Sequence, residues 1–133
     1  MFNIDNPNKE KEEQGMWGKY QGSEFLVRHT SNFDFQRAFS RLQLPYRKKV
    51  EKGSLDPETS LDIMCEAMSM GLLVGWKNVT DKTGEEIPFS KEMAYKALYN
   101  SADLREWVQD FASDTDNFKE DERQALGKPL ENS

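Results

Sequence analysis

The sequence is poor in the residue types that build catalytic and metal centres. It contains one histidine, His29, and one cysteine, Cys65. The single cysteine excludes an intrachain disulfide and favours a cytoplasmic setting, and the lone histidine leaves no His/Cys cluster for zinc. The phosphate-binding pattern GxxxxGK[ST] and the dinucleotide-binding pattern GxGxxG are absent. Paired carboxylates are frequent near both ends, but these segments are too polar to hold them in a fixed geometry. We therefore expect no enzymatic activity, no cofactor and no metal.

A long apolar run is missing as well. The longest candidate, residues 68–74, is far shorter than the roughly 20 residues that span a bilayer. Residues 1–15 lack the apolar core of a signal peptide. Charged residues make up 32% of the chain, the mean hydropathy is −0.87 and the net charge is −6. We expect a soluble protein with no membrane partner.

The length of 133 residues predicts one domain between two polar ends. Residues 1–15 are predicted to form a flexible N-terminal arm, residues 16–113 a single mainly helical domain, and residues 114–133 an acidic, loosely ordered C-terminal tail. In MWGKYQGSEFLVRH, two short strand-like segments flank Gln21-Gly22-Ser23, which predicts a minor N-terminal β-hairpin. A lone hairpin is marginally stable, so it should pack on helices. The predicted fold class is mainly α.

The predicted helices have recognisable starts and apolar faces. Capping residues stand at Asn32, Asp56, Ser90 and Ser101, and Pro57 follows Asp56 at the first helical position. Pro45 interrupts the helix that begins after Asn32, and a short second piece is expected to end at Gly53. Apolar residues recur at i, i+3, i+4 and i+7 in two helices, as Phe35, Ala38, Phe39 and Leu42, and as Leu104, Trp107, Val108 and Phe111.

The segment after Asp56 is apolar on two sides and is expected to lie at the centre of the core. One stripe consists of Leu61, Met64, Met68 and Leu72, and the other of Ile63, Ala67, Met70 and Val74. The methionines could fill the core or form an adaptable binding surface. Cys65 is expected to be a small core residue. Trp76, where this apolar segment ends, and Trp107 are also predicted to belong to the core.

The sequence DKTG at residues 81–84 superficially suggests a calcium loop. If Gly84 is placed at the sixth position of an EF-hand, the first, third and fifth positions are Val79, Asp81 and Thr83. The acidic ligands that an EF-hand requires at the first, fifth and twelfth positions are then missing. The pattern instead predicts a turn in which Asp81 bonds nearby backbone and Gly84 has a positive φ.

Charge is distributed unevenly along the chain. Residues 28–52 contain seven Lys/Arg and two acidic residues, a net charge of +5, so the remainder carries −11. Such a basic segment binds nucleic acid in some proteins, but no recognition motif accompanies it and the acidic remainder repels phosphate. We expect a solvated helix face or a surface for an acidic protein partner. The candidate partner-binding residues are Arg37, Arg41, Arg47, Lys48, Lys49, Met68 and Met70.

Several features follow one another in order between residues 24 and 111. They are FLVR at 25–28 leading into Asn32 and Phe35, PYR at 45–47 with Gly53, a long helix ending in Gly75-Trp76, DKTG at 81–84, IPFS at 87–90 with a helix reaching Leu98, and the helix from Leu104 to Phe111. In this order and spacing the chain resembles the tail assembly chaperones of long-tailed bacteriophages. The similarity covers roughly two thirds of the chain and rests on the combination, since each feature alone is common.

The resemblance implies a small, non-catalytic, largely helical protein of the host cytoplasm that is absent from the mature virion. Such proteins bind the tape measure protein and help recruit tail tube protein around it, and self-association is a further option. Many have a longer form made by ribosomal frameshifting, for which Gly127-Lys128 is a candidate position. Two alternatives stay open: an acidic nucleic-acid mimic that inhibits a host nuclease, and a structural head–tail connector or tail component.

Overall fold

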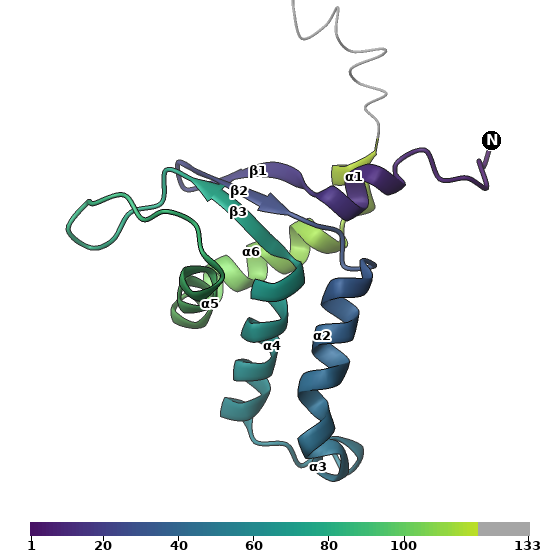
Figure 1. Cartoon of the computed structure of the whole chain (residues 1–133), viewed down its shortest axis with the longest axis vertical. Helices are drawn as coiled ribbons and strands as arrows, with labels where there is room; N and C mark the ends of the chain where they lie inside the picture. The colour runs from purple at the N-terminus through teal and green to yellow at the C-terminus, as the bar shows by residue number, and fades with distance from the viewer. Residues whose placement is uncertain (120–133) are drawn as a thin grey trace, which may run out of the picture.

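The computed structural model describes residues 1–119 of the chain, and its helices predominate (Figure 1). Along the chain the elements are α1 (Lys9–Gln14), β1 (Met16–Tyr20), β2 (Ser23–Val27), α2 (Phe33–Gln43), the 3-10 turn η1 (Leu44–Tyr46), α3 (Arg47–Glu51), α4 (Pro57–Gly71), β3 (Leu73–Lys77), α5 (Lys91–Asn100), α6 (Ala102–Ser113) and the 3-10 turn η2 (Thr115–Phe118). No helix within residues 1–119 combines the length and apolar character of a membrane span.

The predicted hairpin is part of a larger sheet. Strands β1, β2 and β3 form an antiparallel sheet in that order. The turn between β1 and β2 has Gln21 at φ 50° and Gly22 at φ 80°, the pair of positive angles that a tight type I′ hairpin requires. Strand content therefore exceeds the minor hairpin that the sequence predicted.

The third strand comes from residues predicted to be helical. Helix α4 ends at Gly71, and β3 begins at Leu73, so the long helix does not reach Gly75-Trp76. Strand β3 pairs with the open edge of β2, with Leu73 opposite Val27 and Trp76 opposite Phe25. Buried backbone N–H and C=O groups without hydrogen-bond partners are destabilising. Pairing with the free edge of β2 therefore favours a strand for residues 73–77, although their apolar sequence also fits a helix.

The predicted helix starts are confirmed. Side-chain oxygens of the four capping residues accept backbone N–H groups three positions later: Asn32 from Phe35, Asp56 from Thr59, Ser90 from Met93 and Ser101 from Leu104. Pro45 lies in η1, and Gly53, at φ +66°, follows α3. Each of these boundaries depends on local hydrogen bonding or backbone geometry, which the sequence encodes directly.

The core lies between the sheet and helices α4, α5 and α6. Helix α6 crosses one face of the sheet (Figure 1). A Cβ atom at Gly18 would lie 2.6 Å from the Phe111 ring and 2.8 Å from the Trp107 ring, so the glycine allows α6 to approach β1 this closely. Cys65 and Met68 are fully buried, and Trp76 is 8% exposed, while Trp107 is half-buried against the core. The predicted core positions of Cys65 and Trp76 are confirmed.

Helices α2 and α4 form a hairpin that extends from the sheet, with α3 at its far end (Figure 1). The two helices meet closely beside the sheet, where a Cβ atom on Gly71 would lie only 2.5 Å from the backbone nitrogen of Phe35. Asn32 strengthens this junction, because its Nδ2 donates a hydrogen bond of 2.9 Å to the carbonyl oxygen of Gly71. Helix α5 packs against α4 as well.

The two ends of the domain are attached near the base of this hairpin. Within the predicted N-terminal arm, α1 accepts hydrogen bonds from the Arg28 side chain to the Glu13 carbonyl and from His29 N to the Glu12 carbonyl. The flexibility of this arm stays a prediction. In the predicted C-terminal tail, η2 is ordered and Phe118 is fully buried, while residues 120–133, including Gly127-Lys128, lie outside the described residues.

Candidate partner-binding surface

Helix α2 has a strong apolar face that the rest of the domain covers only in part. Of its four periodic apolar residues, Ala38 is buried, whereas Phe35, Phe39 and Leu42 are half-buried. The principal contacts of α2 are with α4. A single neighbouring helix covers one side of an apolar stripe, and the other side of the stripe is left accessible to solvent.

The accessible side of this stripe lines an open hollow between the two helices, which we call the hairpin groove. It is lined by Phe35, Gln36, Phe39 and Ser40 of α2 and by Met64 of α4, and has a volume of about 380 Å³. The Phe35 and Phe39 rings lie 6.1 Å apart, centroid to centroid. Aromatic rings and a methionine give the groove an apolar lining that adapts to the shape of a ligand.

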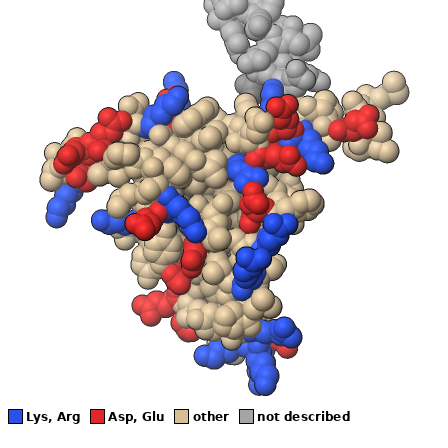
Figure 2. Space-filling model, viewed as in Figure 1, with Lys and Arg blue, Asp and Glu red and all other residues tan. Residues whose placement is uncertain are grey.

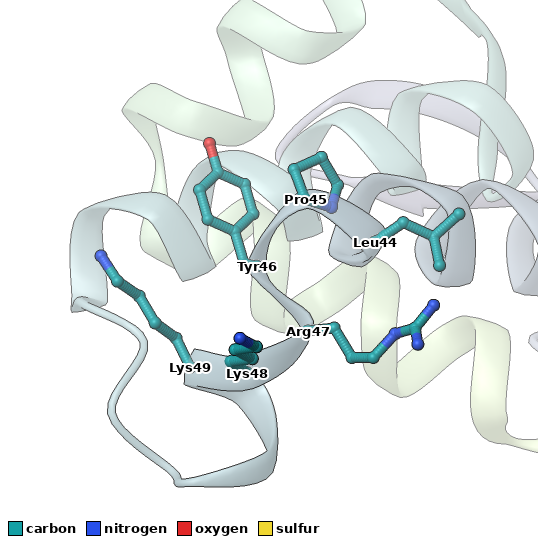
Figure 3. A pocket seen from close by; sticks show the side chains of 6 residues that line it. All are labelled: Leu44, Pro45, Tyr46, Arg47, Lys48 and Lys49. Atoms are coloured by element: carbon teal, nitrogen blue, oxygen red, sulfur yellow. The ribbon is translucent and has the colours of Figure 1, made fainter.

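At the far end of the hairpin, residues 44–52 form a surface that we call the hairpin tip. Figure 3 shows the six side chains around its open hollow: Leu44, Pro45, Tyr46, Arg47, Lys48 and Lys49. Apolar side chains stand beside the cations, with Leu44 57% exposed and Tyr46 and Val50 each 37% exposed. Pro45 ends the continuous α-helix and Gly53 ends α3, so the sequence itself creates this short, exposed turn.

The cations of the hairpin tip are not neutralised by ion pairs. Within residues 1–119, the only pairs closer than 4 Å are Arg28 with Asp34 and Lys119 with Asp116. The pKa of Asp56 is lowered mainly by hydrogen bonds from Thr59 and only slightly by the charge of Lys49. Figure 2 shows Lys and Arg gathered at this end of the molecule. The tip therefore presents positive charge and apolar area together.

The structure brings the five predicted cations onto one hairpin but not onto one side of it. Arg37 and Arg41 are exposed on α2, and Arg47, Lys48 and Lys49 are exposed at the tip. At about 100° per residue, Arg37 and Arg41 each lie about 160° around α2 from the groove residue Phe39, whereas Arg37 is only about 60° from Ser40.

The two predicted methionines differ. Met70 is 40% exposed, so it is available to a partner. Met68 is fully buried and its sulfur lies 3.8 Å from the Gln109 amide nitrogen, so its assignment as a partner-binding residue is corrected. It lies on the face of α4 that packs into the core, where its unbranched side chain fills space.

Sequence reasoning missed the apolar half of this surface. Phe35 and Phe39 were predicted to lie on one apolar helix face, and that spacing alone does not show that part of the face is exposed. The exposed Leu44, Tyr46 and Val50 do have a sequence signal, since they flank the run of Arg47, Lys48 and Lys49 next to a helix-breaking proline. Apolar residues in such a short basic turn are expected to remain exposed at the surface.

The segment at Asp81–Gly84 is a turn, as predicted. The Asp81 carboxylate accepts hydrogen bonds from the backbone N–H groups of Thr83 and Glu85 and from the Thr83 hydroxyl, and Gly84 has φ +87°. The Thr83 hydroxyl is the main reason that the pKa of Asp81 is lowered. Within the described part of the chain, no three His, Cys, Asp or Glu side chains are grouped as they would be around a metal ion.

Comparison with known protein families gives a match. The model of the family described as YdaY prophage protein matches residues 30–128, which include the whole α2–α4 hairpin, the hairpin groove and the hairpin tip. No curated protein and no solved structure gives a match. Because the family match covers well over half of the sequence, this chain belongs to the YdaY prophage protein family and derives from a bacteriophage.

Proposed function

We propose that this protein is a non-catalytic tail assembly chaperone that binds the tape measure protein of its phage and helps recruit tail tube protein around it. The observation that carries the proposal is the α2–α4 hairpin, which extends from the domain with a half-covered apolar face and an unpaired basic tip. A contiguous apolar surface bordered by charged side chains is typical of a protein-binding site.

The phage origin and the resemblance between residues 24 and 111 support the same function. The net charge of −6 is also suited to this role, since a charged protein bound to an aggregation-prone client adds repulsion between complexes. The chaperone would act in the host cytoplasm during assembly and be absent from the mature virion.

Co-expression with the tape measure protein of the same prophage tests this proposal. The client should become soluble and co-purify with the chain, and an unrelated acidic protein of similar size should have neither effect. Purified mature particles should lack the chain. A client that is equally soluble alone would contradict the proposal, as would recovery of this chain from particles in amounts expected of a structural component.

A further inference from the structure

The hairpin groove and the hairpin tip are joined into one surface. Gln36, Ser40 and Leu44 are spaced four residues apart, so they form one row along α2. Gln36 and Ser40 line the groove, and Leu44 lines the hollow at the tip. Figure 3 shows the Leu44 and Arg47 side chains extending to the same side of the tip. The surface therefore continues from an apolar groove to a cation.

The dimensions of this surface limit what binds there. At a rise of about 1.5 Å per residue, the ten residues from Phe35 to Leu44 extend about 14 Å, the length of two to three helical turns. A groove between two packed helices accommodates a third helix, whose apolar residues at i, i+3 or i+4, and i+7 enter it. An extended strand would need a free sheet edge, and the groove provides none.

The positive charge of the hairpin tip also favours a ligand that carries negative charge. Arg47 has no carboxylate partner within 4 Å among the described residues, so a ligand that supplies one gains a charge-assisted hydrogen bond. Nucleic acid would also supply negative charge, but it would leave the Phe35, Phe39 and Met64 lining of the groove unused. An acidic amphipathic helix uses both parts of the surface.

We propose that the hairpin groove binds an amphipathic helix of the tape measure protein, with its apolar stripe against Phe35, Phe39 and Met64 and an acidic residue at Arg47. The choice of client rests on the function proposed above. Arg37 and Arg41 lie opposite Phe39 on α2 but beside Ser40 and Leu44, so they add positive charge at the border of this surface.

Binding of labelled peptides to the purified full-length chain tests this site. Overlapping peptides of about 18 residues, enough for roughly five helical turns, would cover the tape measure protein and be measured by fluorescence anisotropy. The bound peptides should be net acidic and apolar at helical spacing. Raising the ionic strength from about 0.05 M to about 0.5 M should weaken their binding.

Four variants locate the contact. Arg47→Glu and Phe39→Ala should each lower affinity about tenfold, as expected for a charge or aromatic anchor. Ser40→Gln adds a neutral side chain at an exposed groove position without removing packing, so it tests the groove in a fully folded protein, and it should lower affinity severalfold. Lys82→Glu is the matched control, since it makes the same charge change in the exposed turn at residues 81–84, outside the hairpin, and should leave affinity unchanged.

Three results would overturn the site. One is wild-type affinity in both Ser40→Gln and Phe39→Ala. Another is an equal loss in Lys82→Glu and Arg47→Glu, which would indicate general charge attraction. The third is an Arg47-dependent preference for duplex DNA or for phosphatidylglycerol vesicles over every peptide. If the client still co-purifies in any of these cases, the chaperone function stands and the groove is not its binding site. If the client neither binds nor becomes soluble, both proposals fail.

Discussion

At the residue scale, Asn32 connects the hairpin to the sheet. It is 4% exposed, and both the oxygen and the nitrogen of its side-chain amide form hydrogen bonds. Oδ1 accepts the N–H of Phe35 and so begins α2, while Nδ2 donates to the carbonyl oxygens of Gly71 and His29. An aspartate could cap the helix equally well, but its carboxylate lacks the donor that the amide supplies.

The two roles of Asn32 can be separated by Asn32→Asp. The carboxylate keeps the cap but faces two carbonyl oxygens without a proton to donate. Because a buried polar group without its partner is destabilising, the free energy of unfolding should fall by about 1–3 kcal/mol. The exposed Asn3→Asp is the matched control and should change it by less than about 0.5 kcal/mol. Urea unfolding measures both, and equal stabilities would mean that the contact with Gly71 is unimportant.

The two core tryptophans should differ in their contribution to stability. Trp76 is buried, donates a hydrogen bond of 2.8 Å from Nε1 to the Ile87 carbonyl and lies 5.1 Å from the Phe89 ring. Trp76→Ala should therefore cost about 3–5 kcal/mol of unfolding free energy. Trp107 is only half-buried, so Trp107→Ala should fall at or below the lower end of that range. Wild-type stability in either variant would show that the tryptophan is not a packing residue.

Acid should destabilise the domain through its carboxylate caps and turns. The pKa values of Asp56 and Asp81 are lowered from 3.8, mainly by the hydroxyls of Thr59 and Thr83. Folding thus favours the ionised carboxylates, so this stabilisation is complete well above pH 3.8 and is lost as pH falls through the lower folded-state values. Unfolding measured from neutral pH to pH about 2 should show this loss. It should be smaller in the double variant Asp56→Asn/Asp81→Asn, and an identical loss would contradict this origin.

At the scale of elements, the change from α4 to β3 shows how packing decides a conformation. The residues around this boundary fit a continuing helix stripe, with Leu72 and Val74 at its end. The strand forms instead because β2 has an open edge, where Arg28 N donates to the Leu72 carbonyl and Leu73 pairs with Val27. Gly71 is the last residue of α4, and because it has no side chain the backbone of α2 can pass close to it.

Gly71→Ala should separate the two helices of the hairpin. The added Cβ would lie 2.5 Å from backbone N and 2.6 Å from Cα of Phe35, and backbone cannot move aside as a side chain can. Overpacking of this kind costs about 1–3 kcal/mol. Gly75→Ala is the control, because its nearest contact is the Leu26 Cβ at 3.2 Å, and its loss should be smaller. Thermal unfolding of both variants decides the matter, and a neutral Gly71→Ala would indicate that α2 is free to shift.

At the scale of the whole molecule, the point where the described chain leaves the domain lies far from the hairpin tip. The described chain leaves the domain after η2, where Phe118 is anchored against His29 and Phe111. In Figure 1 this exit lies beside the sheet and α1, at the opposite end of the molecule from α3. A chain extension therefore departs from the domain at the end opposite the hairpin tip.

This arrangement is compatible with a longer, frameshifted form of the protein, which the resemblance to tail assembly chaperones implies. In host cells producing phage particles, an antibody against residues 16–113 should detect the 15.4 kDa chain and a second, larger and less abundant product. Mass spectrometry of the larger product should show a junction near Gly127-Lys128. A single product would exclude frameshifting for this protein, and the chaperone proposal would then apply to the short chain alone.

The sequence by itself determined the local features of this protein. Helix starts at Asn32, Asp56, Ser90 and Ser101, the tight turn at Gln21-Gly22, the turn at Asp81–Gly84 and the basic character of the hairpin tip all depend on neighbouring residues, so they could be predicted. The buried positions of Cys65 and Trp76 also followed from apolar patterning.

Only the tertiary structure decided which apolar residues are covered and which conformation residues 73–77 adopt. An apolar stripe shows that a face avoids water, but its periodicity is the same whether one helix or several elements cover it. Thus Met68 is buried while Phe35 and Phe39 remain partly accessible, although all three belong to apolar stripes. Burial depends on contacts between segments distant in sequence, and the candidate binding surface exists because α2 has only one principal neighbour.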